Sequence, residues 1–283
     1  MLLGYSTWGM PKLPIEVAVE HVARLGFDGI ELTVVPGYST ELSRLDREER
    51  RRIRQLLDTH RLALPSIAVH RDLVVDDPQE WATNLAFLQG AIDLAVELAG
   101  PEGTPVINNL VGGKSGEFDL QHLRLVERLH QVLAYATLRG VTIAVEPHVF
   151  TILESPTITK QLIEEIDSPY LRVQFDISHF DVLGYTIEES VSVLAPLAVH
   201  THVKDQRGRS PDHEFLIPGE GPFDYVRYLK AMRQAGYSGF ITGEVSVMVQ
   251  RRPNYDPLAA TALTYQTLAR AFEVAGIPRA RRT

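Results

Sequence analysis

The chain has 283 residues, of which 45% are hydrophobic and 23% are charged, and this composition is ordinary for a globular protein. It contains no cysteine, which excludes disulfides, thiolate metal ligands and cysteine nucleophiles. The formal net charge of −8 disfavours a protein that neutralises phosphates along a duplex, so nucleic acid is not an expected partner.

The beginning of the chain and its longest apolar stretches bear on where the protein resides. The first five residues, MLLGY, lack the basic region of a signal peptide. No apolar stretch approaches the length of a membrane span. These features predict a cytoplasmic protein that does not contact membranes.

Apolar, β-branched segments alternate with amphipathic segments from one end of the chain to the other. The predicted strands are residues 2–6, 29–33, 62–69, 105–110, 141–146, 171–176, 197–203 and 240–245. The predicted helices are residues 15–25, 47–60, 78–99, 119–139, 157–166, 186–194, 223–235 and 257–275. Gly26 and Gly140 follow two of these helices, as glycine commonly does, and Ser155 or Thr157 is the expected N-cap of the fifth. Between the seventh strand and its helix, residues 206–222 read as a polar loop.

This strict alternation indicates parallel strands joined by right-handed helical crossovers. Eight such units close an α/β barrel of the (β/α)₈ TIM-barrel type. Because no change in composition divides the chain, we expect one domain over residues 1–283. An open, doubly wound sheet is the alternative, although no G-x-G-x-x-G motif follows the first strand.

Polar side chains close each of the last four predicted strands. They are Glu146, Asp176, His202 and Glu244. Since barrel active sites lie at the carboxyl ends of the strands, we expect these side chains to converge. A single carboxylate at a strand end is more often a helix cap or an ion-pair partner, but four in successive units favour a metal site. Mostly oxygen ligands with one imidazole suit Mn²⁺, Mg²⁺ or Co²⁺, and Zn²⁺ is also compatible.

These residues lie in short motifs that resemble a known family. The motifs are Glu-Pro-His at 146–148, Asp-Ile-Ser-His at 176–179, His-Val-Lys-Asp at 202–205, Pro-Gly-Glu-Gly at 218–221 and Gly-Glu at 243–244. Together with residues 26–32 and 236–239, they resemble the xylose isomerase-like TIM-barrel superfamily. The closest likeness is to its sugar phosphate isomerase/epimerase branch, which includes ketose 3-epimerases, hydroxypyruvate isomerase and inosose dehydratase. The resemblance covers essentially the whole chain.

The resemblance implies a metal-dependent sugar or polyol isomerase or epimerase. The implied ligands of one divalent ion, with Mn²⁺ expected, are Glu146, Asp176, His202 and Glu244. The resemblance further implies that Glu146 and Glu244 are an acid/base pair. One glutamate removes a proton next to a polarised carbonyl, and an enediolate then regains a proton. A homodimer or homotetramer is the expected assembly.

Further polar residues near the strand ends are candidates for substrate contact. They are His179, His70, Lys204, Arg207 and Arg209. His179 matches a family histidine that binds substrate oxygen, and the two arginines flank the position of an epimerase arginine. Lys204 acts as an acid/base or phosphate-contacting group, or else forms a salt bridge with Asp205. The epimerase glutamate after the fifth strand has no clean match, because Glu154 lies two residues too far along.

Three further residues are interpreted as supporting groups rather than reacting ones. Glu31 anchors the structure or hydrogen-bonds a ligand residue. His148 and His200 are either partners of the metal ligands or have solvent-facing or core roles.

Three rival functions remain open at this point. A lyase of the inosose or dehydroshikimate dehydratase type uses the same proton abstraction and then loses hydroxide. A DNA repair enzyme like endonuclease IV needs three zinc ions. However, Asn108 and Asn109 stand where that family has a histidine, and Asp212 and His213 are adjacent where that family has an Asp-x-His motif with one residue between them. A non-catalytic sugar-binding barrel is disfavoured by the intact set of predicted ligands.

Overall fold

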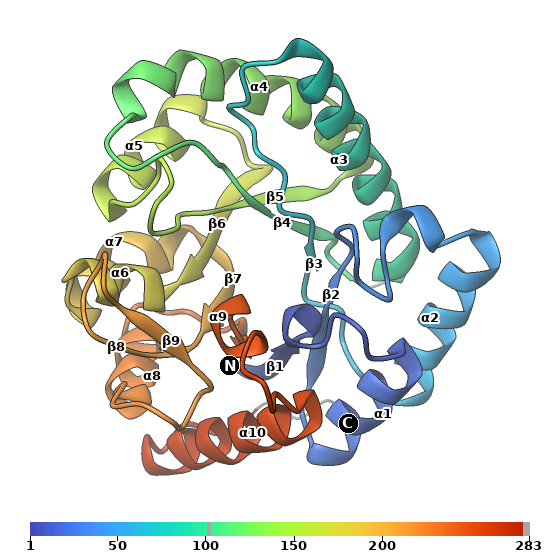
Figure 1. Ribbon diagram of the computed structural model, residues 1–283, viewed down its shortest axis with the longest axis vertical. Helices are drawn as coiled ribbons and strands as arrows, with labels where there is room; N and C mark the ends of the chain where they lie inside the picture. The colour runs from blue at the N-terminus through green and yellow to red at the C-terminus, as the bar shows by residue number, and fades with distance from the viewer. Residues whose placement is uncertain (101–102, 280–283) are drawn as a thin grey trace.

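A computed structural model describes residues 1–100 and 103–279 of the chain. Eight parallel strands form a closed barrel in the order β1-β10-β7-β6-β5-β4-β3-β2, surrounded by helices (Figure 1). The strands are β1 (Leu2–Ser6), β2 (Gly29–Thr33), β3 (Ile67–Ala68), β4 (Val106–Leu110), β5 (Thr142–Glu146), β6 (Leu171–Asp176), β7 (Ala198–Val203) and β10 (Phe240–Gly243). The predicted (β/α)₈ TIM barrel is confirmed.

The outer ring consists of the helices that follow the barrel strands. They are α1 (Ile15–Leu25), α2 (Arg47–Thr59), α3 (Pro78–Ala99), α4 (Phe118–Arg139), α5 (Pro156–Ile166), α7 (Ile187–Leu194), α8 (Tyr225–Gln234) and α10 (Pro257–Val274). Ser155 caps α5 as expected, because its side chain accepts from the N–H of Ile158. Gly26 ends α1 at φ 98°, a left-handed conformation that glycine adopts without steric cost. Among the described residues, no helix combines the length and the apolar character that crossing a bilayer requires.

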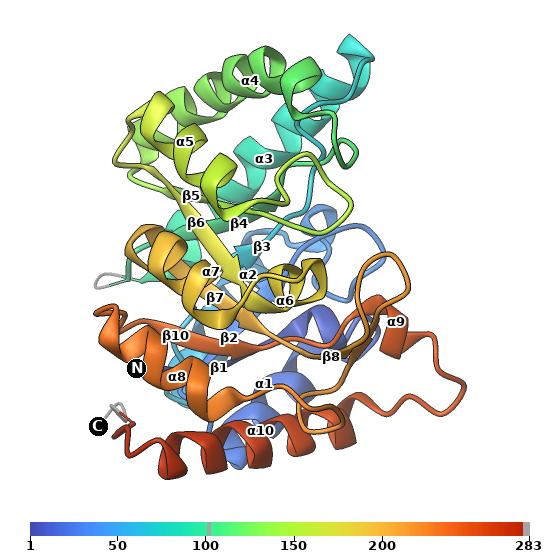
Figure 2. The same cartoon turned by 90° about the vertical axis from the view of Figure 1, so that its left-hand side faces the viewer.

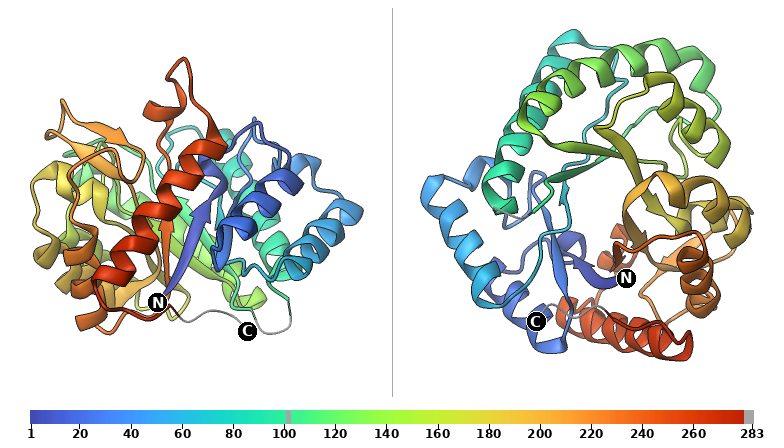
Figure 3. Two further views of the ribbon diagram at one scale, coloured as in Figure 1. Left: turned by 90° about the horizontal axis from the view of Figure 1, so that it is seen from below. Right: turned by 180° about the vertical axis from the view of Figure 1, so that it is seen from behind.

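Short elements decorate the carboxyl ends of the strands. They are η1 (Thr7–Gly9), η2 (Leu42–Arg44), α6 (Ile177–Leu183), the antiparallel pair β8 (Asp205–Arg207) and β9 (Glu214–Leu216), and α9 (Val247–Gln250). A further short helix, η3 (Ala195–Leu197), leads into β7 at the amino ends. The hairpin of β8 and β9, together with α6 and α9, lies at the end of the barrel opposite the N terminus (Figures 2 and 3). The sequence predicted an irregular loop where this hairpin lies.

The third predicted strand is shorter than expected. In place of residues 62–69, the structure has the two-residue β3 and one isolated bridge between Gly29 and Ala63. Pro65 lies between these two pairings and has no N–H to donate, which accounts for the interruption of the ladder.

The barrel strands are buried on both sides, but the two sides differ in chemistry. On β7, the fully buried His200 and His202 alternate with Thr201 and Val203. Successive side chains of a strand point to opposite faces, so one set faces the barrel interior and the other faces the helices. The outward set joins the hydrophobic core, and the inward set supplies the polar groups of the site.

Candidate functional site

The structure brings the four predicted ligand residues together at the carboxyl end of the barrel. Glu146 ends β5, Asp176 ends β6, His202 lies on β7 and Glu244 follows β10. Their exposed fractions are 1%, 0%, 0% and 3%, respectively. One ligand atom each of Asp176, His202 and Glu244 lie within 4.8 Å of one another. The Nδ1 atom of His202 lies 3.5 Å from Oε1 of Glu146 and 3.4 Å from Oε1 of Glu244.

We call Glu146, Asp176 and Glu244 the carboxylate cluster. Lys204 is 3% exposed, and its Nζ contacts Asp176 and lies 2.5 Å from Oε2 of Glu244. Burial lowers the pKa of Lys204, but the charges of Asp176 and Glu244 outweigh burial and raise the pKa above its usual value. Lys204 is therefore an ammonium that offsets part of the negative charge of the cluster.

The alternative pairing of Lys204 with Asp205 is wrong. Asp205 accepts hydrogen bonds from the backbone N–H groups of Gly219 at 2.9 Å and Phe223 at 3.0 Å. Its role is to organise the loop that follows β9. The two neighbouring side chains thus serve different structures, because successive residues point in different directions from extended chain.

His202 bridges the cluster and the second barrel strand. Its Nε2 lies 2.8 Å from Oε1 of Glu31, while its Nδ1 faces the cluster. With the amide oxygen of Gln174 turned toward His202, that oxygen accepts from a protonated Nδ1 at 2.9 Å and from the backbone N–H of His202 at 3.2 Å. Burial lowers the pKa of His202, but the surrounding carboxylates, Glu31 and Glu244 foremost, raise it well above its usual value.

His70, two residues beyond β3, lies beside the cluster. Its Nε2 lies 3.3 Å from Oε2 of Glu146, an oxygen without a hydrogen-bond partner among the described residues. His70 has φ 40°, which is unusual for a non-glycine residue, and its ring lies 4.5 Å from that of Trp8. Strained backbone of this kind is concentrated at functional sites.

His179 borders the cluster on the other side. Its Nε2 lies 3.4 Å from Oδ2 of Asp176, and its ring lies 3.7 Å from the ring of His148. Burial lowers the pKa of both histidines, and the proximity of His148 lowers that of His179 further. Neither ring nitrogen of His179 has a hydrogen-bond partner within the described ranges. A neutral imidazole with free nitrogens can donate to or accept from a ligand.

The arrangement fits a hard divalent cation. Three carboxylates and one imidazole converge, and Glu146, Asp176 and His179 form a second, overlapping group of ligand atoms within 4.8 Å. Glu146 Oε2 is a buried oxygen with no hydrogen-bond partner in the described part of the chain. Such a set of mostly oxygen donors suits Mn²⁺, Mg²⁺ or Co²⁺ and tolerates Zn²⁺.

The structure does not bring the two candidate arginines to the cluster. Arg207 pairs with Glu214 at 2.6 Å across the β8–β9 hairpin, and its side chain is 65% exposed. Arg209 lies 3.6 Å from Asp181 and is 63% exposed. Substrate contact by either arginine stays a prediction. Glu154, the residue displaced from the epimerase position, hydrogen-bonds Ser115 instead.

The additional ligands of an endonuclease IV-like site are not assembled either. The side chain of Asn109 is engaged by the backbone of Arg71, through contacts of 2.7 and 3.0 Å. His213 packs against the ring of Phe215 with centroids 4.7 Å apart, and it belongs to none of the metal-binding groups found among the described residues.

A separate cavity of about 1270 Å³ contains none of the predicted site residues. It lies at the amino ends of the strands, where its lining includes Val106, Thr142, Ala198 and Phe240. Active sites of TIM barrels form at the opposite face, so this cavity is not the candidate site.

Comparison with known proteins adds evidence that is independent of this geometry. Residues 19–264 match the family model described as xylose isomerase-like TIM barrel. Fructoselysine 3-epimerase from Shigella flexneri is 24% identical over 274 residues, covering 89% of this chain and 93% of that relative. Inosose dehydratase from Clostridium perfringens is 24% identical over 166 residues, or 52% of each chain. The crystal structure of a D-psicose 3-epimerase in the presence of D-fructose superimposes with a TM-score of 0.79 at 16% identity, covering 98% of this chain and 100% of that one.

Proposed function

Because the chain belongs to the xylose isomerase-like TIM barrel family, we propose that it is a divalent-metal-dependent isomerase or epimerase of a sugar or polyol. The observation that carries the proposal is the convergence of Glu146, Asp176, His202 and Glu244 at one end of the barrel. The match to fructoselysine 3-epimerase over most of both chains supports epimerase chemistry.

In this proposal, the metal is held by carboxylate oxygens of Glu146, Asp176 and Glu244 and by Nδ1 of His202. Mn²⁺ is the expected ion. When bound, it supplies electrophilic stabilisation of the negative charge that develops on substrate oxygens. Burial raises the pKa of Asp176, but the charge of Lys204 outweighs burial and keeps this carboxylate ionised. The ammonium also contacts Glu244.

Glu146 and Glu244 transfer the protons. One carboxylate removes the proton from the carbon next to the carbonyl, and the electrons of the broken C–H bond move to the carbonyl oxygen to give an enediolate. Return of a proton to the opposite face of the same carbon gives the epimer, and return to the neighbouring carbon gives the isomer. Both glutamates lie within 3.5 Å of the same atom, Nδ1 of His202, so they border one small space from two strands.

The histidines around the cluster position the substrate. His179 offers neutral ring nitrogens that can hydrogen-bond a hydroxyl group, and His70 lies between Glu146 and Trp8. The carboxylate cluster and His202 are at most 3% exposed, and electrostatic interactions are stronger in such a buried, low-dielectric environment.

A lyase is the second candidate, and the similarity of half the chain to inosose dehydratase favours it. Both reactions begin with the same proton abstraction, but the lyase then expels hydroxide. A panel of ketoses, aldoses and inososes followed by NMR in deuterated water separates them. Deuterium at a carbon next to the carbonyl, without loss of water, supports the epimerase or isomerase; a dehydrated product supports the lyase.

The acid/base assignment is tested with Glu146→Gln and Glu244→Gln, which keep the side-chain shape. Loss of a general acid or base lowers turnover by roughly 10²–10⁴-fold. Circular dichroism checks that each variant is folded. Turnover that persists in either folded variant would overturn the proposed role of that glutamate.

A further inference from the structure

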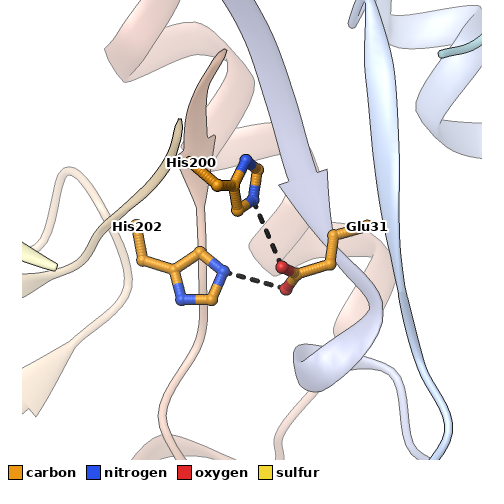
Figure 4. A group of neighbouring side chains, drawn as sticks. All are labelled: Glu31, His200 and His202. Atoms are coloured by element: carbon orange, nitrogen blue, oxygen red, sulfur yellow. Dashed lines mark hydrogen bonds and ion pairs between the residues drawn. The ribbon is translucent and has the colours of Figure 1, made fainter. Parts of the chain in front are cut away.

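Glu31 lies in the barrel interior beside His200 and His202 (Figure 4). It belongs to β2, whereas the two histidines belong to β7, so its side chain reaches across the barrel. Its Oε1 lies 2.8 Å from Nε2 of His202, and its Oε2 lies 3.2 Å from Nε2 of His200. All three residues are 0% exposed.

Two serines complete the surroundings of this carboxylate. Ser6 is the register partner of Glu31 on β1, and its hydroxyl donates to Oε1 at 2.6 Å. The hydroxyl of Ser66, just before β3, donates to Oε2. Each oxygen of Glu31 therefore has one serine and one histidine as neighbours. This set of donors holds the carboxylate in place and compensates the cost of burying its charge.

The geometry points to Glu31 as a positioning residue that selects the tautomer of His202. A carboxylate accepts but does not donate, so the nitrogen that faces it has to carry the proton. The carboxylates of Glu146 and Glu244 face Nδ1 and favour a proton there in the metal-free protein. When a cation takes the place of that proton, Glu31 keeps the remaining proton on Nε2 and so leaves the lone pair of the neutral imidazole on Nδ1. The amide of Gln174 can adapt to either state of Nδ1, because its oxygen accepts from a protonated Nδ1 and, once the amide is turned, its nitrogen can donate to a lone pair there. The inference rests on the proposed function, in which His202 is a metal ligand.

A purely structural role for Glu31 makes a different prediction from a positioning role. Glu31→Gln keeps the size of the side chain, but its amide can donate to Nε2 as well as accept from it. The variant therefore no longer holds the proton on Nε2, and a proton on Nδ1 can block ligation. Ser6→Ala is the matched control, because it removes one hydrogen bond to the same carboxylate oxygen and leaves an acceptor facing His202. Groups that orient a metal-binding histidine typically contribute roughly 10–100-fold to metal affinity.

The experiment is calorimetric titration of chelator-treated protein with MnCl₂, at one pH, for the wild type and both variants. We expect Glu31→Gln to weaken Mn²⁺ binding by about 10–100-fold and Ser6→Ala by less than about threefold. Thermal unfolding of the metal-free proteins shows whether each variant is folded. Equal affinity of the wild type and a folded Glu31→Gln variant would refute the inference while leaving the proposed metal site intact.

Two further results separate this inference from the proposed function. If the wild type binds none of Mn²⁺, Mg²⁺, Co²⁺ and Zn²⁺, the metal site itself fails and the positioning role falls with it. If Glu31→Gln does not fold, ¹⁵N NMR of histidine in the zinc-loaded wild type still decides the question. A proton on Nε2 of His202 supports the inference, and a proton on Nδ1 overturns it.

Discussion

Lys204 provides the strongest stability prediction, because it is a buried cation that contacts two buried carboxylates. Its side chain is 4% exposed, and those of Asp176 and Glu244 are 0% and 4% exposed. Lys204→Met retains the length of the apolar stem and removes the charge. Asp176 and Glu244 then remain in the interior without their shared ammonium.

Removal of one partner from a buried ion pair typically costs about 3–5 kcal/mol, because the remaining charge is left uncompensated. For a chain of this size, each kcal/mol corresponds to roughly 2 °C in Tm, so we expect the metal-free variant to melt about 6–10 °C below the wild type. A divalent cation at the carboxylate cluster restores the lost compensation. Saturating Mn²⁺ is therefore expected to raise the Tm of Lys204→Met more than that of the wild type.

The assay is thermal unfolding with chelator and with added MnCl₂. Lys230→Met is the matched control, since Lys230 is exposed on α8 and surface substitutions of this kind change stability by less than about 0.5 kcal/mol. If Lys204→Met and Lys230→Met melt at the same temperature in chelator, the ammonium does not compensate the cluster, and the electrostatic account of the site is wrong.

Two other predictions concern protonation and packing. The metal-free protein should lose stability as pH falls from 7 to 5.5, because burial keeps the folded-state pKa of His148, His179 and His200 below the unfolded value near 6.5. The raised pKa of His202 acts in the opposite direction, but it is one group against three. The unfolded chain then binds protons that the folded chain does not, which costs about 1.4 kcal/mol of stability per pH unit for each proton. His179→Gln should make the unfolding free energy, measured by urea denaturation, depend less steeply on pH. An unchanged pH dependence would contradict the lowered pKa of His179. On α4, Leu129→Ala should lower the unfolding free energy by about 2–5 kcal/mol, because Leu129 is 0% exposed. Leu120→Ala is the control: this position is 85% exposed, and the substitution should cost less than about 0.5 kcal/mol in the same assay. Equal effects of the two substitutions would show that the helix packs differently.

The barrel and the convergence of its strand-end residues were accessible from sequence, for a geometric reason. Parallel strands in a closed barrel end at the same rim, so Glu146 and Asp176 on neighbouring strands must approach each other once the strands are identified. The apolar, β-branched run before Glu146 identified its strand. His202 followed from the same rule, because it pairs in register with Asp176.

Contacts that depend on side-chain direction or on distant strands were not accessible in the same way. Lys204 and Asp205 are adjacent in sequence but contact different partners. Arg207 faces Glu214 because the two residues are register partners in the β8–β9 hairpin. The sequence of this hairpin has no alternation of apolar and polar residues from which it could be predicted. The contribution of Ser6 required knowledge that β1 and β2 are neighbours with Ser6 opposite Glu31. The available signal was that Ser6 ends the strand next to the one that carries Glu31, where a hydroxyl group can hydrogen-bond a buried carboxylate.

In the proposed metal site, four side chains at the barrel rim hold one divalent cation. Calorimetric titration of chelator-treated protein with MnCl₂ tests this site most directly, with the wild type and Asp176→Asn measured side by side. The variant removes the charge but keeps an oxygen that can accept from the N–H of Ser178 and so cap α6. We predict one ion per chain in the wild type and loss of binding in Asp176→Asn. No binding of Mn²⁺, Mg²⁺, Co²⁺ or Zn²⁺ by the wild type, or equal binding by the variant, would contradict the account.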